Sequence, residues 1–118
     1  MANVAVWFDI PANDVKRAEK FYSAVLNAKC EPIPGMEGFV LPHKDNDVSG
    51  CIFKKEGEAP SPHGVLIYLG AQGRLDDAIA KVAPNGGKIL QPKHPIGPYG
   101  FRAVVLDSEG NRIALHSM

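Results

Sequence analysis

The 118-residue sequence has no excess of charge of either sign, because 13 lysines and arginines balance 13 aspartates and glutamates. No stretch gathers enough lysine and arginine to neutralise a series of phosphates. The composition therefore argues against nucleic acid as a partner. At this length we expect one domain, residues 1–118, burying roughly 65% of the surface of the unfolded chain.

Long apolar runs and cysteine motifs are missing as well. Nowhere do 18 apolar residues follow one another, and the first residues lack the positive region and the small-residue cleavage site of a secretory leader. We therefore expect a cytoplasmic protein without a membrane partner. Cys30 and Cys51 form neither a Cys-x-x-Cys pattern nor a mixed Cys/His ligand pattern, so we expect two buried free thiols.

The run of residues 100–117 predicts a β-hairpin. Residues 101–106 are apolar apart from Arg102, and residues 112–117 provide the second strand. Between them, Asp-Ser-Glu-Gly-Asn has the residue types of a tight turn, since Gly110 and Asn111 can adopt positive φ. A hairpin therefore ends this sequence.

The two halves of the chain predict the same order of elements. In the first half we expect a strand at 4–9, a helix from the N-cap Asp14 to Asn27, and strands near 30–33, 38–41 and 49–54. In the second half we expect a strand at 64–69, a helix over 75–82, and strands near 88–91, 101–106 and 112–117. A polar linker, residues 55–62, separates modules at about 1–54 and 63–118.

The opening strand and helix, with Ile10-Pro11 between them and Phe21-Tyr22 late in the helix, combine with the closing hairpin into a family resemblance. The chain resembles the vicinal oxygen chelate superfamily, which holds glyoxalase I, fosfomycin- and bleomycin-resistance proteins and extradiol dioxygenases. The resemblance implies an α+β fold in which paired βαβββ modules form a curved mixed β-sheet cup with the helices outside. It also implies a small ligand in the cup and, in many members, a divalent metal at its floor.

The positions at which this resemblance expects metal ligands carry unsuitable side chains. They fall on Trp7, on or beside Cys51, on Leu66 (Ile67 if the register slips by one) and on Ala114. A hard divalent cation needs carboxylate, carbonyl or imidazole donors. We therefore expect neither a metal nor another cofactor. An Asp9–His116 pair is the local remnant that could still hold a metal weakly.

Because successive side chains of a strand point to opposite faces, the alternation along each predicted strand indicates which side chains would line the cup. The candidate ligand-binding residues are Trp7, Asp9, Tyr68, Tyr99, Arg102 and His116. Arg102 can form two parallel hydrogen bonds with a carboxylate, and Tyr99 lies in a Gly/Pro-rich loop that could cover the cup. We therefore expect a small organic ligand, with an anionic or an aromatic molecule as the two options. Two structural alternatives to ligand binding stay open: Trp7 packs in the core, or Asp9 and Arg102 form a structural ion pair. We expect His43, His63 and His94 at the surface.

Three classes of function fit these observations. The first is a metal-free binding module of the bleomycin-resistance type, and the second is a lyase or isomerase with a divergent site whose catalytic residues are unknown. The third is an interaction protein whose cup is packed shut by Trp7, Phe53 and Tyr68. For all three we expect a homodimer, formed side by side or by exchange of modules across the linker.

Overall fold

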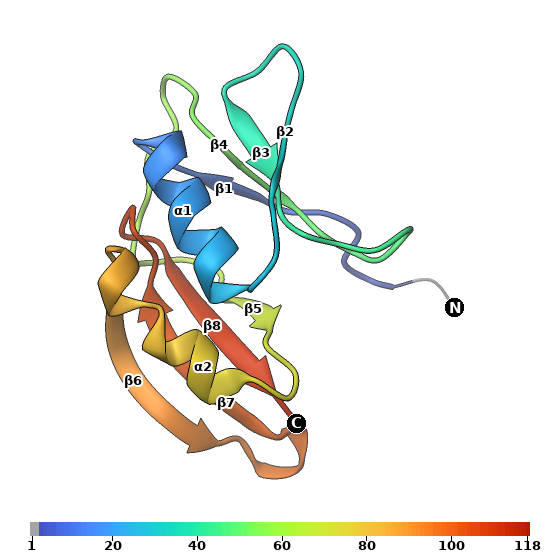
Figure 1. Ribbon diagram of the computed structural model, residues 1–118, viewed down its shortest axis with the longest axis vertical. Coiled ribbons are helices and arrows are strands. Elements are labelled where there is room, and N and C mark those ends of the chain that lie inside the picture. Colours follow the sequence, from blue (N-terminus) through green and yellow to red (C-terminus); the bar gives the residue numbers. More distant parts are fainter. Residues whose placement is uncertain (1–2) are drawn as a thin grey trace.

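The computed structural model describes residues 3–118 as two four-stranded sheets with two α-helices (Figure 1). The first half contains β1 (Asp9–Pro11), α1 (Val15–Val25), β2 (Glu31–Pro32), β3 (Gly38–Val40) and β4 (Cys51–Phe53). The second half contains β5 (Ile67–Gly70), α2 (Leu75–Ala80), β6 (Lys88–Pro95), β7 (Phe101–Leu106) and β8 (Arg112–Ser117). Short 3-10 helices lie at Ala83–Asn85 and Gly97–Tyr99.

Both sheets have the same topology. Their strand orders are β1-β4-β3-β2 and β5-β8-β7-β6, and in each sheet the first and last strands of the module pair in parallel while the other pairs are antiparallel. This repetition confirms the predicted α+β class and the pair of βαβββ modules.

The first helix follows the expected capping chemistry. The Asp14 carboxylate accepts a hydrogen bond from the backbone N–H of Arg17 at 3.0 Å, and Asn27 after the helix has φ 53°. Phe21 and Tyr22 are fully buried. The predicted start and end of this helix are therefore confirmed.

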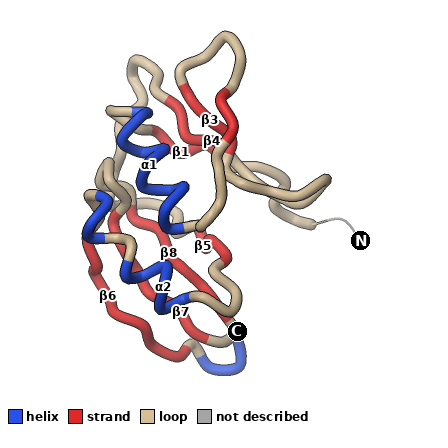
Figure 2. Tube along the Cα trace, in the orientation of Figure 1, coloured by secondary structure: helices blue, strands red, loops and turns tan. Residues whose placement is uncertain are grey.

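The two modules share one hydrophobic core. Its members come from both helices and from both sheets, and they include Phe21, Phe39, Val82, Val105 and Leu115. Figure 2 shows both helices on one side of the strands. The alternate side chains of each strand therefore point to the opposite side, which the helices leave uncovered. None of the helices in residues 3–118 is long and apolar enough to cross a membrane.

The strand predicted at 4–9 is wrong for most of its length. Strand β1 starts only at Asp9, because its parallel neighbour β4 starts at Cys51 and offers no ladder to the residues before it. Val4 and Val6 are 93% and 72% exposed. Residues 3–8 therefore form an extended segment that leads away from the helices (Figure 1).

Strand β6 runs four residues beyond the predicted end at 91. It continues because His94 pairs with Arg102 and Pro95 with Phe101 on β7. Pro92 lies at a shift of register between Gln91 and His94. A proline is tolerated there because β6 is an edge strand and the missing N–H falls at an irregularity of the ladder.

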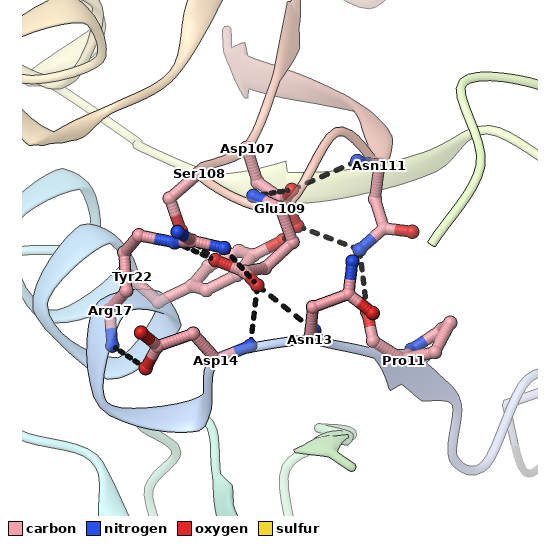
Figure 3. A network of polar contacts seen from close by, with 9 residues as sticks. All are labelled: Pro11, Asn13, Asp14, Arg17, Tyr22, Asp107, Ser108, Glu109 and Asn111. Carbon is pink, nitrogen blue, oxygen red and sulfur yellow. Dashed lines mark hydrogen bonds and ion pairs between the residues drawn. The ribbon is translucent and has the colours of Figure 1, made fainter. Parts of the chain in front are cut away.

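The β7–β8 turn fastens the second half of the chain to the first (Figure 3). The buried Asp107 carboxylate accepts hydrogen bonds from the Tyr22 hydroxyl at 2.5 Å and from the backbone and side chain of Asn111. The Asn111 side chain also donates to the carbonyl of Pro11 at 2.7 Å. Burial, and next the charge of Asp107, hold the pKa of Tyr22 well above its ordinary value, so the phenol keeps its proton and donates it.

Glu109 extends this contact to the start of α1. Its carboxylate accepts hydrogen bonds from the backbone N–H groups of Asn13 and Asp14 at 2.9 and 2.7 Å, and it pairs with the Arg17 guanidinium at 2.7 Å. Burial opposes its ionisation, but these donors together with Ser108 outweigh burial and lower the pKa of Glu109. We call Tyr22, Asp107, Glu109 and Asn111 the turn clamp.

Candidate functional site

The six predicted site residues fall into two groups on different sheets. Trp7 and Asp9 lie beside the first sheet, where Cys51 joins them. Tyr68, Tyr99, Arg102 and His116 lie on or beside the second sheet. Within residues 3–118 no hydrogen bond or ion pair links one group to the other.

The first group centres on one carboxylate oxygen. Oδ1 of Asp9 accepts hydrogen bonds from the Trp7 indole and from the Cys51 thiol, each at 3.1 Å. Burial, and next the hydrogen bond to Asp9, raise the pKa of Cys51 to about 11. The thiol is therefore protonated at neutral pH. Trp7 is 48% exposed, so the alternative that it serves as core packing is wrong.

The second group centres on the Arg102 guanidinium. Nη1 donates to the Tyr68 hydroxyl in a short hydrogen bond, and the guanidinium carbon lies 5.8 Å from the centre of the Tyr68 ring. Nε donates to Nε2 of His94 at 3.0 Å. Since β7 lies between β6 and β8, Arg102 has His94 opposite it on one side and His116 on the other.

The loop before β7 closes one end of this group. Nε2 of His116 lies 2.6 Å from the carbonyl oxygen of Tyr99, and the Tyr68 and His116 rings meet edge to face at 6.3 Å. Tyr99 ends the short helix that Figure 2 shows near the C-terminus, and it is 70% exposed. Gly100 follows with φ 92°, and a Cβ there would lie 2.4 Å from the carbonyl oxygen of Ser117, so the close approach requires glycine.

His94 is the site residue that the sequence analysis missed. We predicted it as a surface histidine, but it is half-buried and hydrogen-bonded to Arg102. The prediction failed because it ended the strand at residue 91. Had the predicted strand been extended to Pro95, just before the short helix at Gly97–Tyr99, its pairing with β7 would have placed His94 beside Arg102.

Arg102 is a cation surrounded by neutral acceptors. Its two hydrogen-bond partners are a phenol and an imidazole, and none of the ion pairs in residues 3–118 includes it. The predicted alternative of an Asp9–Arg102 ion pair is therefore wrong, and Asp9 and His116 are not brought together either. In the described part of the chain Nη2 donates to no protein atom and Nη1 to one, which leaves N–H groups on both for a ligand oxygen.

A hollow of about 350 Å³ borders Tyr68. Its lining includes Phe8, Leu41 and Val48 of the first module and Tyr68 and Gly70 of the second. A smaller hollow of about 200 Å³ borders Asp9 and Cys51. Tyr68 is 46% exposed, so in the single chain it does not seal the uncovered side of the sheet.

The residues at the expected metal-ligand positions do not fit a divalent metal. The Trp7 indole nitrogen carries a hydrogen that it donates to Asp9, and Ala114 is a buried methyl group, so neither offers a lone pair to a metal. Ile67 packs on the core, so the register places Leu66 on the opposite face, where it offers only hydrocarbon. Within residues 3–118 no three or more His, Cys, Asp or Glu side chains cluster as a metal site would require.

Comparisons with known proteins agree with this architecture. Residues 4–115 match the family model of the Glyoxalase/Bleomycin resistance protein/Dioxygenase superfamily. A "Glyoxylase-like domain-containing protein" of Didymella fabae is 34% identical over 116 residues, which cover 91% of this chain and 88% of that protein. "Putative glyoxylase CFP32" of Mycobacterium tuberculosis is 26% identical over 92% of this chain, which spans less than half (43%) of that relative.

Solved structures share the fold at low sequence identity. A glyoxalase/bleomycin resistance protein from Albidiferax ferrireducens has a TM-score of 0.83 at 19% identity, covering 98% of this chain and 99% of that one. The fosfomycin resistance protein FosX from Listeria monocytogenes has a TM-score of 0.69 at 14% identity, covering 100% and 95% of the two chains.

Proposed function

Because the chain belongs to the Glyoxalase/Bleomycin resistance protein/Dioxygenase superfamily, we propose that it binds a small organic anion on the second sheet, anchored by Arg102, without a divalent metal. The observation that carries this proposal is the Arg102 guanidinium, which is fixed by two neutral partners and paired with no carboxylate in residues 3–118. A half-buried cation of this kind favours an anionic ligand, because the ligand supplies the missing countercharge.

The surroundings of Arg102 favour a ligand with a carboxylate and an aromatic or apolar body. The guanidinium can form two parallel hydrogen bonds with a carboxylate. Arg102 does not line the hollow of about 350 Å³, but Tyr68 both accepts its hydrogen bond and lines that hollow. A ligand that extends past Tyr68 would therefore reach the apolar side chains of Phe8, Leu41 and Val48. Trp7 and Asp9 are expected to contact the ligand only if it reaches across to the first sheet.

A lyase or isomerase is the alternative, and the convergence of Tyr68, Arg102 and His116 favours it. Such an enzyme needs an acid or base that can exchange a proton with the bound substrate. Here the Tyr68 hydroxyl is held by Arg102, Nε2 of His116 faces the Tyr99 carbonyl, and the Asp9 carboxylate is held by Trp7 and Cys51. These commitments favour binding over catalysis.

Binding of benzoate, with benzyl alcohol as its neutral counterpart, tests the proposal. We expect benzoate to bind and benzyl alcohol to bind much more weakly, as measured by calorimetry. Arg102→Ala should weaken benzoate binding by roughly 1.5 to 3 kcal/mol, and Arg102→Lys should restore part of it, because an ammonium cannot form the fork. Equal binding of the two probes, or no effect of Arg102→Ala, would contradict the proposal.

The metal-free part of the proposal has its own control. A chelator should leave benzoate affinity unchanged, and zinc, manganese, nickel or iron(II) should not raise the melting temperature, since a metal that binds the native state would stabilise it. A rise in melting temperature that disappears in Asp9→Ala or His116→Ala would show instead that a metal binds. We also propose that the protein is cytoplasmic and forms a homodimer, as expected from the sequence.

A further inference from the structure

We infer that His94 is a positioning residue for Arg102: its neutral ring, protonated at Nδ1, fixes the guanidinium for anion binding, and a second proton on the ring releases it. This inference rests on the proposed function, because it concerns the same Arg102 site. His94 is not one of the six ligand-binding residues predicted from the sequence.

Two hydrogen bonds fix the protonation state of His94. Nδ1 lies 2.9 Å from the carbonyl oxygen of Pro92, which can only accept, so Nδ1 must carry a proton. Nε2 lies 3.0 Å from Nε of Arg102, which can only donate, so Nε2 must offer its lone pair. Both contacts are satisfied together only by the neutral ring with its proton on Nδ1.

The strand geometry makes this arrangement specific. His94 and Arg102 are directly paired across β6 and β7, and the register shift between Gln91 and His94 brings the Pro92 carbonyl to the ring of His94. Arg102 is thereby held at Nε by His94 and at Nη1 by Tyr68. The remaining Nη2 side of the guanidinium then has a fixed direction, which lowers the entropy cost of binding an anion.

A second proton on His94 would undo the arrangement. It would place an N–H on Nε2 against the N–H of Arg102, and one cation against another at 3.0 Å. Strand pairing places Arg102 on β7 directly beside His94 and His116 on β8 one strand further away. Tyr68 on β5 contacts Arg102, and Lys93 precedes His94 on its own strand. None of these four groups is a carboxylate, and Asp76, which pairs with Lys93, is committed to that cation. A second positive charge on His94 would therefore lack a countercharge from this set.

The experiment compares His94→Gln, which keeps a neutral acceptor but cannot take up a proton, with His94→Ala, which has no acceptor. The probe is benzoate, whose carboxylate stays ionised between pH 8 and pH 5.5. For the wild type we expect a lower affinity at pH 5.5 than at pH 8. His94→Gln should keep an affinity within about threefold at both pH values, and His94→Ala should be about tenfold weaker already at pH 8. His43→Ala, which removes an exposed histidine, is the matched control and should behave as the wild type.

A measurement without any probe separates this inference from the proposed function. In ¹⁵N NMR spectra at pH 8, His94 should show the neutral form protonated at Nδ1, and the Nε–H signal of Arg102 should exchange slowly with water. Because acid by itself slows the exchange of an unbonded Nε–H, the exchange is compared with that of His94→Ala at the same pH. Protection should be present at pH 8 in the wild type and in His94→Gln, and at pH 5.5 it should be lost in the wild type alone. If these signals are as expected and no anion binds, the proposed function fails while the positioning contact stands. If benzoate binds through Arg102 but its affinity is indifferent to His94→Ala and to pH, the inference is wrong while the proposed function stands.

Discussion

The Cys51 thiol and the Asp9 carboxylate control each other's chemistry at the first sheet. The thiol donates to the same oxygen that accepts the Trp7 indole, and a thiolate in its place would face a negative charge at 3.1 Å. Burial is the larger cause of the raised pKa of Cys51, and Asp9 is the next. Cys51 is therefore poorly suited to act as a nucleophile at neutral pH.

Asp9→Asn should make Cys51 more reactive. Removing the negative charge should lower the pKa of the Cys51 thiol from about 11, although burial keeps it above the ordinary value of 9.0. At pH 8 the larger thiolate fraction should speed alkylation by roughly threefold to tenfold. The measurement is iodoacetamide labelling in a Cys30→Ser background, with Asp76→Asn as a control that removes a distant carboxylate. Identical rates in all variants would show that Asp9 does not govern the thiol.

Strand parity located the Arg102 group but not its full membership. The alternation of side chains put Arg102, Tyr68 and His116 on one face of the second sheet, and the structure brings these three together. Parity alone does not show which strands continue beyond their apolar residues, so His94 was missed. It also does not show how two sheets sit relative to each other, so Trp7 and Asp9 were assigned to the same cup although no polar contact joins them to Arg102 in residues 3–118.

At the scale of elements, the turn clamp couples the β7–β8 hairpin to the start of α1. The Glu109 side chain is fully buried, while its partner Arg17 is half exposed. Its two backbone donors, Asn13 and Asp14, belong to the turn before the helix. The clamp therefore links the last hairpin to the first helix across more than 90 residues of sequence.

Glu109→Gln should lower the free energy of unfolding by about 1 to 2 kcal/mol at pH 7. Because the pKa of Glu109 is lowered in the folded state, its charge stabilises the fold above the ordinary value of 4.5, and this stability is lost as the pH falls from 4.5 through the lower folded value. Urea unfolding at pH 7, 4.5 and 3 should show the difference between wild type and variant shrinking towards pH 3. Glu31→Gln, at an exposed strand position, should show no such trend; a difference that persists at pH 3 would mean that the charge is not the cause.

The sequence predicted most elements but not the limits set by pairing. The α1 boundaries follow from local chemistry at Asp14 and Asn27, so they were predictable. The start of β1 and the end of β6 depend instead on where a neighbouring strand begins or continues. No local pattern in Val-Ala-Val-Trp distinguishes a strand from an extended segment without a partner, since both are apolar.

At the scale of the whole molecule, apolar side chains remain exposed on elements that the helices do not cover. Val4, Val6, Trp7, Tyr68 and Tyr99 are each at least 46% exposed. Within residues 3–118 the backbone of residues 4–7 makes no hydrogen bond, although the sequence of this segment is that of a buried strand. An apolar strand without a partner is a site at which another chain can add, and a second copy of this chain offers the same surface by symmetry.

We therefore expect a homodimer that uses the segment of residues 3–8. One chain already closes a core between its two modules, so pairing should not require an exchange of modules. Sedimentation should show a dimer in the micromolar range for the wild type and a monomer for Val6→Glu, because the charge would have to be buried in the contact. Lys20→Gln on the exposed surface of α1 changes the net charge by the same amount and should remain a dimer. A wild type that is monomeric throughout this range, or a Val6→Glu variant that remains a dimer, would show that residues 3–8 do not form the contact.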